Sequence, residues 1–572
     1  MIVVPSCCIF QVEVIRVVSR RTFVTGLVTG GALFGAGAFD LRALAQGTRR
    51  PQEVLRGTSF DLSIGEAPMN FTGSTKIAQT INGSIPGPVL RWREGDMVTL
   101  RVANSLDEDT SIHWHGIVLP ADMDGVPGLS FHGIRPRETY TYRFQVKQSG
   151  TYWYHSHSAF QEQRGVYGPL VIEPREPDPI AFDREHVILL SDWTDENPER
   201  VFRKLKKQSD YYNFHKRTLG DFFTDARKNG LGSTIADRSA WGAMRMNPTD
   251  LADVGGSTYT HLMNGVAPNG NWTGLFTSGE RVRLRFINGS SMTYFDVRIP
   301  GLKMTVVAAD GQHVHPVTVD EFRIATAETF DVIVEPSGQD AFTIFAQAMD
   351  RTAYAAGTLA VRDGLRAPVP SLDPRVILTM NDMGHGQDMS AHAGHEMPGM
   401  PKHPSSENNP LVDMQTMMPA PKLDDPGLGL RDNGRRVLAY ADLKSTFADP
   451  DGRDPSREIE LHLTGHMEKF AWSFDGIKFS DAAPLLFTYG ERLRIVLVND
   501  TMMTHPIHLH GMWSDLEDGG GAFHVRKHTI DMPPGTRRTY RVKADALGRW
   551  AYHCHLLFHM EAGMFREVRV QS

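Results

Sequence analysis

One pattern occurs three times along the 572-residue chain and constrains the fold more than any other feature. The three copies read INGSIPGPVLRWREGDMVTLRVANS from Ile81, LMNGVAPNGNWTGLFTSGERVRLRFINGS from Leu262 and WSFDGIKFSDAAPLLFTYGERLRIVLVND from Trp472. Each copy runs from a turn, through a glycine followed by an acidic residue, to an alternating apolar segment that reaches an asparagine. Alternation with a period of two is typical of a half-buried β-strand, and internal repeats indicate related structural modules. The sequence therefore predicts three related β domains.

Turn residues support an all-β fold. Gly, Pro and Asn are frequent between the alternating segments, and helical periodicity is scarce, which is typical of β-sandwich domains. We expect these domains at residues 50–178, 183–368 and 435–572. A stretch at about 195–256 is expected to be partly helical, and we assign it no chemistry. We expect a Met- and His-rich linker at 376–434, and within it the stretch from Met380 to Met418 is too rich in Gly, Pro and polar residues to pack a core.

The amino terminus has the features of an export signal. The sequence SRRTFV carries the arginine pair Arg20 and Arg21 and precedes a Gly- and Ala-rich apolar run, and the small residues of Ala43–Ala45 offer a cleavage site. An uncleaved membrane anchor is the alternative. We favour a twin-arginine signal peptide over residues 1–45, which predicts a periplasmic protein with no membrane span in the mature chain. Its removal would leave Cys554 as the only thiol, so no intramolecular disulfide is expected.

The charge composition argues against one class of partner. The chain carries 60 basic and 67 acidic residues, a formal net charge of −7, and has no basic stripe. Proteins that neutralise phosphates concentrate Lys and Arg on one face. We therefore predict no binding of nucleic acid.

The repeats also align histidines. Eighteen and twenty residues after Gly95 stand His113 and His115, and the same offsets from Gly490 reach His508 and His510. The same offsets from Gly279 in the middle copy reach Val297 and Ile299. A second register agrees, since His155 follows Gly150, and His553 follows Gly548, by five residues. The first and third copies therefore carry a potential metal-binding edge that the middle copy lacks.

Four short motifs contain these histidines: HWHG at 113, HSH at 155, HPIHLHG at 505 and HCHLLFH at 553. In a strand, residues i and i+2 face the same side, so each His-x-His pair can direct two imidazoles into one cavity. A single pair can arise by chance, but two pairs at equivalent places of two repeats are harder to dismiss. Structural zinc usually takes several thiolates. One cysteine with ten histidines fits copper better. The ten are His113, His115, His155, His157, His505, His508, His510, His553, His555 and His559.

These motifs, in this order, resemble those of three-domain multicopper oxidases, and most closely the CopA-type periplasmic copper-resistance oxidases, over about residues 55–572. The resemblance implies three cupredoxin-like Greek-key β-sandwich domains and four copper ions. It implies type 1 ligands at His505, Cys554, His559 and Met564, and type 2 ligands at His113 and His508. The implied type 3 ligands are His115, His155, His157, His510, His553 and His555. Because the type 2 histidines come from the first and third repeats, these two domains are expected to face each other.

The resemblance also implies a reaction: four one-electron oxidations coupled to reduction of dioxygen to two waters. Cys554 lies between His553 and His555, which gives a short covalent path between the type 1 and type 3 centres. Asp124, eleven residues after His113, matches the acidic position of the family and would serve as a proton relay. An ordinary Asp-Gly turn is the alternative for this residue.

A methionine-rich stretch bears on the electron donor, because thioethers are soft ligands that select Cu(I). We interpret residues 380–418 as a surface that collects Cu(I). Two other functions stay open: a laccase-like oxidase of small phenols, and a periplasmic copper-sequestering protein. Four further methionines could extend the copper path or simply pack in the core. The stretch contains Met380, Met383, Met389, Met397, Met400, Met414, Met417, Met418, His385, His392, His395 and His403, and the four further methionines are Met502, Met503, Met512 and Met560.

Overall fold

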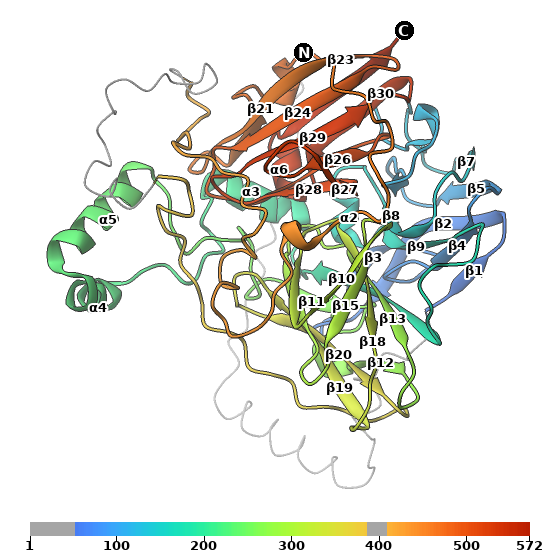
Figure 1. Ribbon diagram of the computed structural model, residues 1–572, viewed down its shortest axis with the longest axis horizontal. Coiled ribbons are helices and arrows are strands. Elements are labelled where there is room, and N and C mark those ends of the chain that lie inside the picture. The colour runs from blue at the N-terminus through green and yellow to red at the C-terminus, as the bar shows by residue number, and fades with distance from the viewer. Residues whose placement is uncertain (1–51, 386–408) are drawn as a thin grey trace, which may run out of the picture. The chain divides into compact units, whose positions relative to one another are not determined.

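The computed structural model describes residues 52–385 and 409–572, and its strands form six sheets (Figure 1). The prediction of an all-β fold is confirmed. The predicted signal peptide lies outside the described residues, as do Met389, His392, His395, Met397, Met400 and His403. None of the helices in the described ranges is long and apolar enough to cross a bilayer.

The first β unit comprises residues 54–173. Its two sheets have the strand orders β1-β4-β9-β8-β6 and β3-β2-β5-β7. The strands are β1 (Val54–Arg56), β2 (Ser59–Met69), β3 (Lys76–Ile81), β4 (Val89–Arg93), β5 (Met97–Asn104), β6 (His113–His115), β7 (Thr139–Gln145), β8 (Gly150–His155) and β9 (Tyr167–Glu173), and the short helix α2 (Gln161–Arg164) follows β8.

The second β unit comprises residues 184–360, with sheets β11-β10-β13-β18-β15-β16 and β12-β20-β19-β14-β17. Its strands are β10 (Arg184–Trp193), β11 (Thr260–Met263), β12 (Trp272–Leu275), β13 (Val282–Asn288), β14 (Phe295–Arg298), β15 (Met304–Ala309), β16 (Gln312–Val319), β17 (Glu321–Ile324), β18 (Thr329–Val334), β19 (Ala341–Ala348) and β20 (Tyr354–Ala360).

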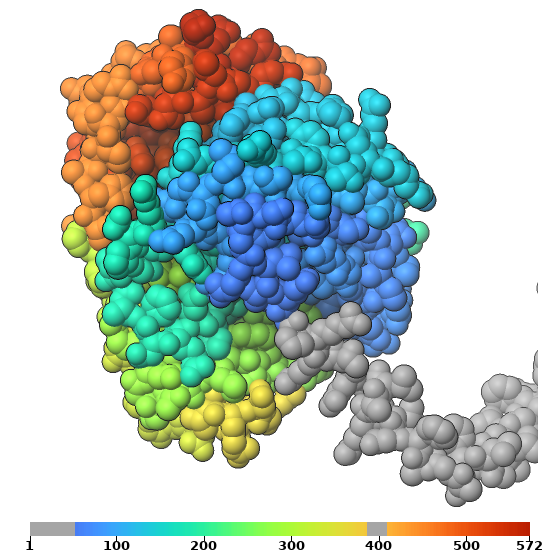
Figure 2. Space-filling model, turned by 90° about the vertical axis from the view of Figure 1, so that its right-hand side faces the viewer, coloured from blue at the N-terminus to red at the C-terminus, as the bar shows by residue number. Residues whose placement is uncertain are grey.

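The third β unit comprises residues 457–571, with sheets β22-β21-β24-β29-β26-β27 and β23-β31-β30-β25-β28. Its strands are β21 (Arg457–His466), β22 (Ala471–Phe474), β23 (Leu485–Thr488), β24 (Arg492–Asn499), β25 (His505–Leu509), β26 (Ser514–Glu517), β27 (Phe523–Lys527), β28 (Thr529–Met532), β29 (Arg537–Lys543), β30 (Gly548–Cys554) and β31 (Phe565–Gln571), and helix α6 (Leu557–Glu561) follows β30. In Figure 2 the first unit, in blue and cyan, adjoins the third unit in orange and red and the second in green and yellow.

The asparagines that end the repeated pattern have the same structural role in all three units. Asn104, Asn288 and Asn499 are buried at the ends of β5, β13 and β24. Each side-chain NH2 group donates to two backbone carbonyls, and each side-chain oxygen accepts the backbone N–H of the residue two positions later in the chain. The repeated asparagine therefore makes the same set of hydrogen bonds in each unit, and these bonds fix the loop that leads to the next strand.

The stretch between β10 and β11 is partly helical, as expected. It holds α3 (Pro198–Lys207), α4 (Leu219–Asn229) and α5 (Leu231–Ala243). Asn197 caps the amino-terminal end of helix α3, because its side chain accepts the Arg200 N–H, and the helix buries Val201 and Leu205. Helices α4 and α5 stand out to one side in Figure 1.

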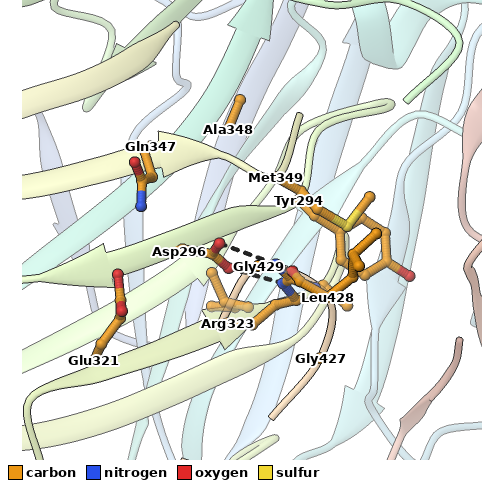
Figure 3. A network of polar contacts seen from close by, with 12 residues as sticks. Tyr294, Asp296, Glu321, Arg323, Gln347, Ala348, Met349, Gly427, Leu428 and Gly429 are labelled. Atoms are coloured by element: carbon orange, nitrogen blue, oxygen red, sulfur yellow. Dashed lines mark hydrogen bonds and ion pairs between the residues drawn. The ribbon is translucent and has the colours of Figure 1, made fainter. Parts of the chain in front are cut away.

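The segment between the second and third units has no helix or strand in the described parts of 376–434, but it is packed. Leu378, Met383 and Leu430 are buried, so the expectation that residues 380–418 cannot pack a core is wrong for Met383. Both carboxylate oxygens of Asp296 bind the Arg323 guanidinium, at 2.7 and 2.9 Å (Figure 3). Arg323 also donates to the carbonyl of Leu428 at 2.9 Å. The second unit thus anchors the described part of this segment.

Candidate metal centre

Three side chains of the third unit converge in one buried cluster. His505 begins β25, Cys554 ends β30 and His559 lies on α6, and all three are fully buried. The Cys554 Sγ lies 3.5 Å from His505 Nδ1 and 3.8 Å from His559 Nδ1, and the two nitrogens are 3.1 Å apart. The local fold explains the convergence, because β25 pairs with β30 and places Ile507 opposite Cys554. The first three residues of α6, including His559, face inward.

The ring nitrogens of this cluster that point away from Cys554 are held by partners. Thr501 Oγ1 lies 2.7 Å from His505 Nε2, and Asp253 Oδ2 lies 2.8 Å from His559 Nε2. Asp253 belongs to the stretch 195–256, to which we assigned no chemistry, so that reading of the sequence missed a residue of the site. Trp472 of β22 packs its ring 4.2 Å from that of His559. These contacts fix the orientation of both imidazoles.

Met564, the fourth residue of the predicted type 1 set, is fully buried beside the cluster. Its N–H donates to the His559 carbonyl and its own carbonyl accepts the Cys554 N–H, both at 3.1 Å. The backbone of Met564 is thereby held against the backbones of two ligand residues.

A second cluster joins the first and third units and brings together the other eight histidines. The rings of His113 and His510 stack at 3.9 Å, as do those of His115 and His508. The strands β6 and β25 therefore face each other, as the resemblance implies. Ligand atoms lie within 4.8 Å of one another in four groups: His113, His508 and His510; His157, His510 and His553; His155, Glu162 and His555; and His115, His508 and His528.

Several ring nitrogens of this second cluster have no hydrogen-bond partner among the described residues. Among the described residues, the Nε2 atoms of His113, His155 and His508 have no hydrogen-bond partner, nor does either nitrogen of His115 or His555. Burial lowers the pKa of His115, His155, His508 and His555, which keeps these imidazoles neutral. A buried unpaired polar atom costs about 1–3 kcal/mol, so such a concentration is unfavourable unless a cation binds there. Neutral imidazoles with free nitrogens are the donors that copper prefers.

Two buried carboxylates border the second cluster. Asp124 Oδ2 lies 2.9 Å from His510 Nδ1, and Asp124 Oδ1 lies 3.3 Å from His113 Nδ1. One carboxylate thus touches imidazoles of both units, at the position expected for the relay. Glu162 on α2 places Oε2 at 2.6 Å from His155 Nδ1, and burial raises the pKa of Glu162. The sequence analysis missed Glu162, because a lone glutamate seven residues after His155 belongs to no recognisable motif.

Comparison with known proteins decides the family. Models of multicopper oxidases match residues 63–177, 184–363 and 452–572. Copper resistance protein A of Escherichia coli is 65% identical, covering 97% of this chain and 99% of its own. The chain belongs to the multicopper oxidase family. Laccase-1 of Cryptococcus neoformans is 27% identical and covers 90% of this chain and 80% of its own. The crystal structure of Fet3p, described as a multicopper oxidase that functions in iron import, matches with a TM-score of 0.63 at 18% identity, covering 90% of this chain and 91% of that one.

This multicopper oxidase is an oxidoreductase that uses copper, and its methionines differ in their access to solvent. Met502, Met503 and Met512 are buried and pack in the core. Met383 is fully buried, which does not fit a surface that collects Cu(I). Met380 and His385 are half-buried, like Met414 and Met417, while Met418 is exposed.

Proposed function

We propose that this multicopper oxidase oxidises Cu(I) to Cu(II) and uses the electrons to reduce dioxygen, as part of copper resistance. The balanced reaction takes four Cu(I), one dioxygen and four protons to four Cu(II) and two waters. The identity of 65% to a copper resistance protein over nearly the whole chain is the observation that carries this proposal. We further propose the division into domains at 50–178, 183–368 and 435–572, and export to the periplasm by the twin-arginine route.

Each predicted copper ion has a set of residues that would hold it. Cys554, His505 and His559, with Met564 beside them, would hold type 1 copper, and His113 with His508 would hold type 2. The two type 3 ions would be held by His115, His155 and His555, whose ring centroids lie 4.9–5.8 Å apart, and by His157, His510 and His553. Bound copper would supply the one-electron chemistry and the reduction of dioxygen.

The protein's own groups orient these ligands and control protons. The carbonyl of Asp124 accepts the Nδ1 proton of His113 at 2.8 Å, which leaves Nε2 free to face the cluster. His508 Nδ1 donates in the same way to the carbonyl of His528 at 2.5 Å. The Asp124 carboxylate next to His510 is suitably placed to hold a proton for the reduction of dioxygen.

Residues 409–413, at one described edge of the methionine-rich segment, contact the third unit near the type 1 cluster. The Asn409 side chain donates to the carbonyl of Gly476 at 3.0 Å, and the Asp413 N–H donates to the carbonyl of Gly465 at 2.8 Å. Both contacts flank β22, whose Trp472 packs on His559. This neighbourhood favours delivery of Cu(I) from the segment to the cluster.

Oxygen uptake by the copper-loaded protein tests the proposal, with Cu(I) and with a small phenol as donors. Replacing Met389, Met397 and Met400 by Leu keeps their bulk but removes the thioethers. We expect this variant to lose Cu(I)-driven uptake more than phenol-driven uptake. Met383→Leu is the matched control, since Met383 is buried and should not take part. An equal loss with both donors would contradict the role of the segment.

A phenol-oxidising function is the second candidate, because a cavity opens beside Asp253. Its volume is about 450 Å³, and its lining includes Tyr212, Phe214 and Leu251 as well as Asp253. Asp253 binds His559, so a molecule in this cavity would lie one residue from the type 1 cluster. Faster oxygen uptake with phenols than with Cu(I) would favour this function. A Cys554→Ser variant that lacks turnover and still protects cells fully would instead indicate sequestration of copper.

A further inference from the structure

A buried carboxylate of the second unit holds the loop that connects β13 and β14. Asp192 lies near the end of β10, and only 3% of it is exposed. Its Oδ1 accepts the Ser291 N–H at 3.0 Å. Its Oδ2 accepts the Met292 N–H at 3.0 Å and the Thr293 hydroxyl at 2.8 Å. Both oxygens of this carboxylate therefore fix residues 290–293.

This loop in turn supports α6, the helix that carries a histidine of the type 1 cluster. The residue before α6 provides no side-chain cap. The Leu557 N–H donates to the Ser291 carbonyl at 3.0 Å. The Phe558 N–H donates to the Met292 sulfur at 3.4 Å. Because the first N–H groups of a helix have no partner within the helix, the loop supplies partners that α6 itself lacks.

A second contact leads from Asp192 to the cluster between the first and third units. The side-chain NH2 of Gln163, on α2, donates to the Asp192 carbonyl at 3.0 Å and to Asp192 Oδ1 at 3.3 Å. Gln163 Oε1 accepts the hydroxyl of Tyr259, a residue of the second unit, at 2.7 Å. The residue before Gln163 is Glu162, whose Oε2 lies 2.6 Å from His155 Nδ1. The helix that orients His155 is thus bound to the same carboxylate group as the loop under α6.

These contacts require a carboxylate and not merely a side chain of this size. Both oxygens at position 192 face hydrogen-bond donors. An asparagine has one acceptor oxygen, and its NH2 group would face an N–H or hydroxyl group that also donates. A buried donor without an acceptor is unfavourable, so an amide here would release part of the loop.

We propose that Asp192 is a positioning residue for both copper centres. It holds α6 through residues 290–293 and α2 through Gln163, and it thereby fixes the orientation of His559 and His155. The inference rests on the proposed function only for the assignment of these two histidines to copper, and it holds for either electron donor. Residues that support metal ligands in this way orient the ligands and tune the metal.

Hydrogen exchange tests the inference, measured by mass spectrometry on the full-length protein with and without copper. Asp192→Asn should speed exchange about 5–10-fold in both α2 and α6, which corresponds to the loss of about one net hydrogen bond. Thr293→Val removes only the hydroxyl that holds the loop, so exchange should rise in α6 alone. Gln163→Leu breaks only the contact with α2, so exchange should rise in α2 alone. Asp296→Asn is the matched control, because Asp296 is a buried carboxylate of the same unit that binds Arg323 instead.

The visible absorption of type 1 copper is a second readout, which a general loss of stability would not move. We expect it to shift in Asp192→Asn and Thr293→Val and to stay unchanged in Gln163→Leu and Asp296→Asn. If Asp192→Asn does not fold, the variants at 293 and 163 still decide the question, because each removes one of the two contacts. Wild-type exchange in both helices, an equal rise throughout the chain, or unchanged absorption in folded Thr293→Val would overturn the inference. Absence of oxygen uptake by the copper-loaded wild type would instead refute the proposed function and leave the exchange result valid.

Discussion

Strand β14 of the second unit and strands β6 and β25 of the other two units are counterparts with different contents. Nine residues after the asparagine that ends each repeat stands His113 in the first unit, Val297 in the second and His508 in the third. Across the sheet, His113 pairs with His155 and His508 with His553, whereas Val297 pairs with Ala346. Val297 and Ile299 are buried apolar residues. The comparison shows that the same kind of sheet edge forms with or without imidazoles, so imidazoles at this position are not a requirement of the fold.

The second unit nevertheless contributes to the site. Among the described residues, none of the groups able to hold a metal includes a residue of 184–360. Two of its carboxylates instead contact residues of the third unit that belong to the clusters or adjoin them: Asp253 binds His559, and Asp310 fixes the backbone at His528. One unit therefore supports the ligands that the other two supply.

The largest effect is expected from His508→Val, which gives β25 the residue that β14 has. Since Val297 is accommodated in the second unit, we expect the variant to fold. Oxygen uptake should fall by more than about 100-fold, because loss of outer partners of metal ligands alone costs about 10–100-fold. Oxygen uptake and the electron paramagnetic resonance signal of type 2 copper should be lost together. A variant that keeps both would show that His508 is not a ligand.

A substitution at the equivalent position of the second unit, Val297→Ala, is the matched control. Removing buried methyl groups should lower the free energy of unfolding by about 1–3 kcal/mol, measured with urea. Oxygen uptake per folded molecule should not change. A large loss of oxygen uptake would mean that β14 takes part in catalysis, which would contradict the comparison of β14 with β6 and β25.

A smaller effect is expected from Asp253→Ala, which tests the support given by the second unit. The change leaves His559 Nε2 without its carboxylate, and we expect oxygen uptake to fall about 10–100-fold. Asp253→Asn should lose less, since an amide oxygen can still accept the Nε2 proton. The visible absorption of type 1 copper should shift in the alanine variant. Equal activity of both variants and the wild type would limit Asp253 to a packing role.

The sequence predicted the fold class and the members of both clusters because their signals are local or repeated. The glycine offsets align His113 with His508, and a strand period of two directs each His-x-His pair to one side. Asp253, Glu162 and His528 escaped prediction for the opposite reason. Each reaches its histidine neighbours through tertiary contacts made by a loop, a four-residue helix or a strand junction, and none of these has a sequence pattern. The burial of Met383 likewise depends on how the linker packs, which composition does not reveal.

The smallest effect concerns the number of protons that the metal-free protein takes up when it unfolds. The strands that carry the clustered histidines should contribute to this number, whereas β14 should not. Burial lowers the pKa of His553 to about 3, whereas an unfolded histidine has a pKa of about 6.5. Unfolding near pH 5 should therefore take up about one proton at this residue. Because the unfolded state binds this extra proton, the free energy of unfolding falls as the pH drops from about 6.5 toward 3, by about 1.4 kcal/mol per pH unit. His553→Gln should remove that share, measured as protons absorbed during urea unfolding with a chelator present. Val297→Ala should leave proton uptake unchanged, because the edge of the second unit carries no titrating group at this position. Equal uptake in His553→Gln and the wild type would mean that His553 is not held neutral in the folded protein, and the contrast between the two kinds of edge would lose its electrostatic basis.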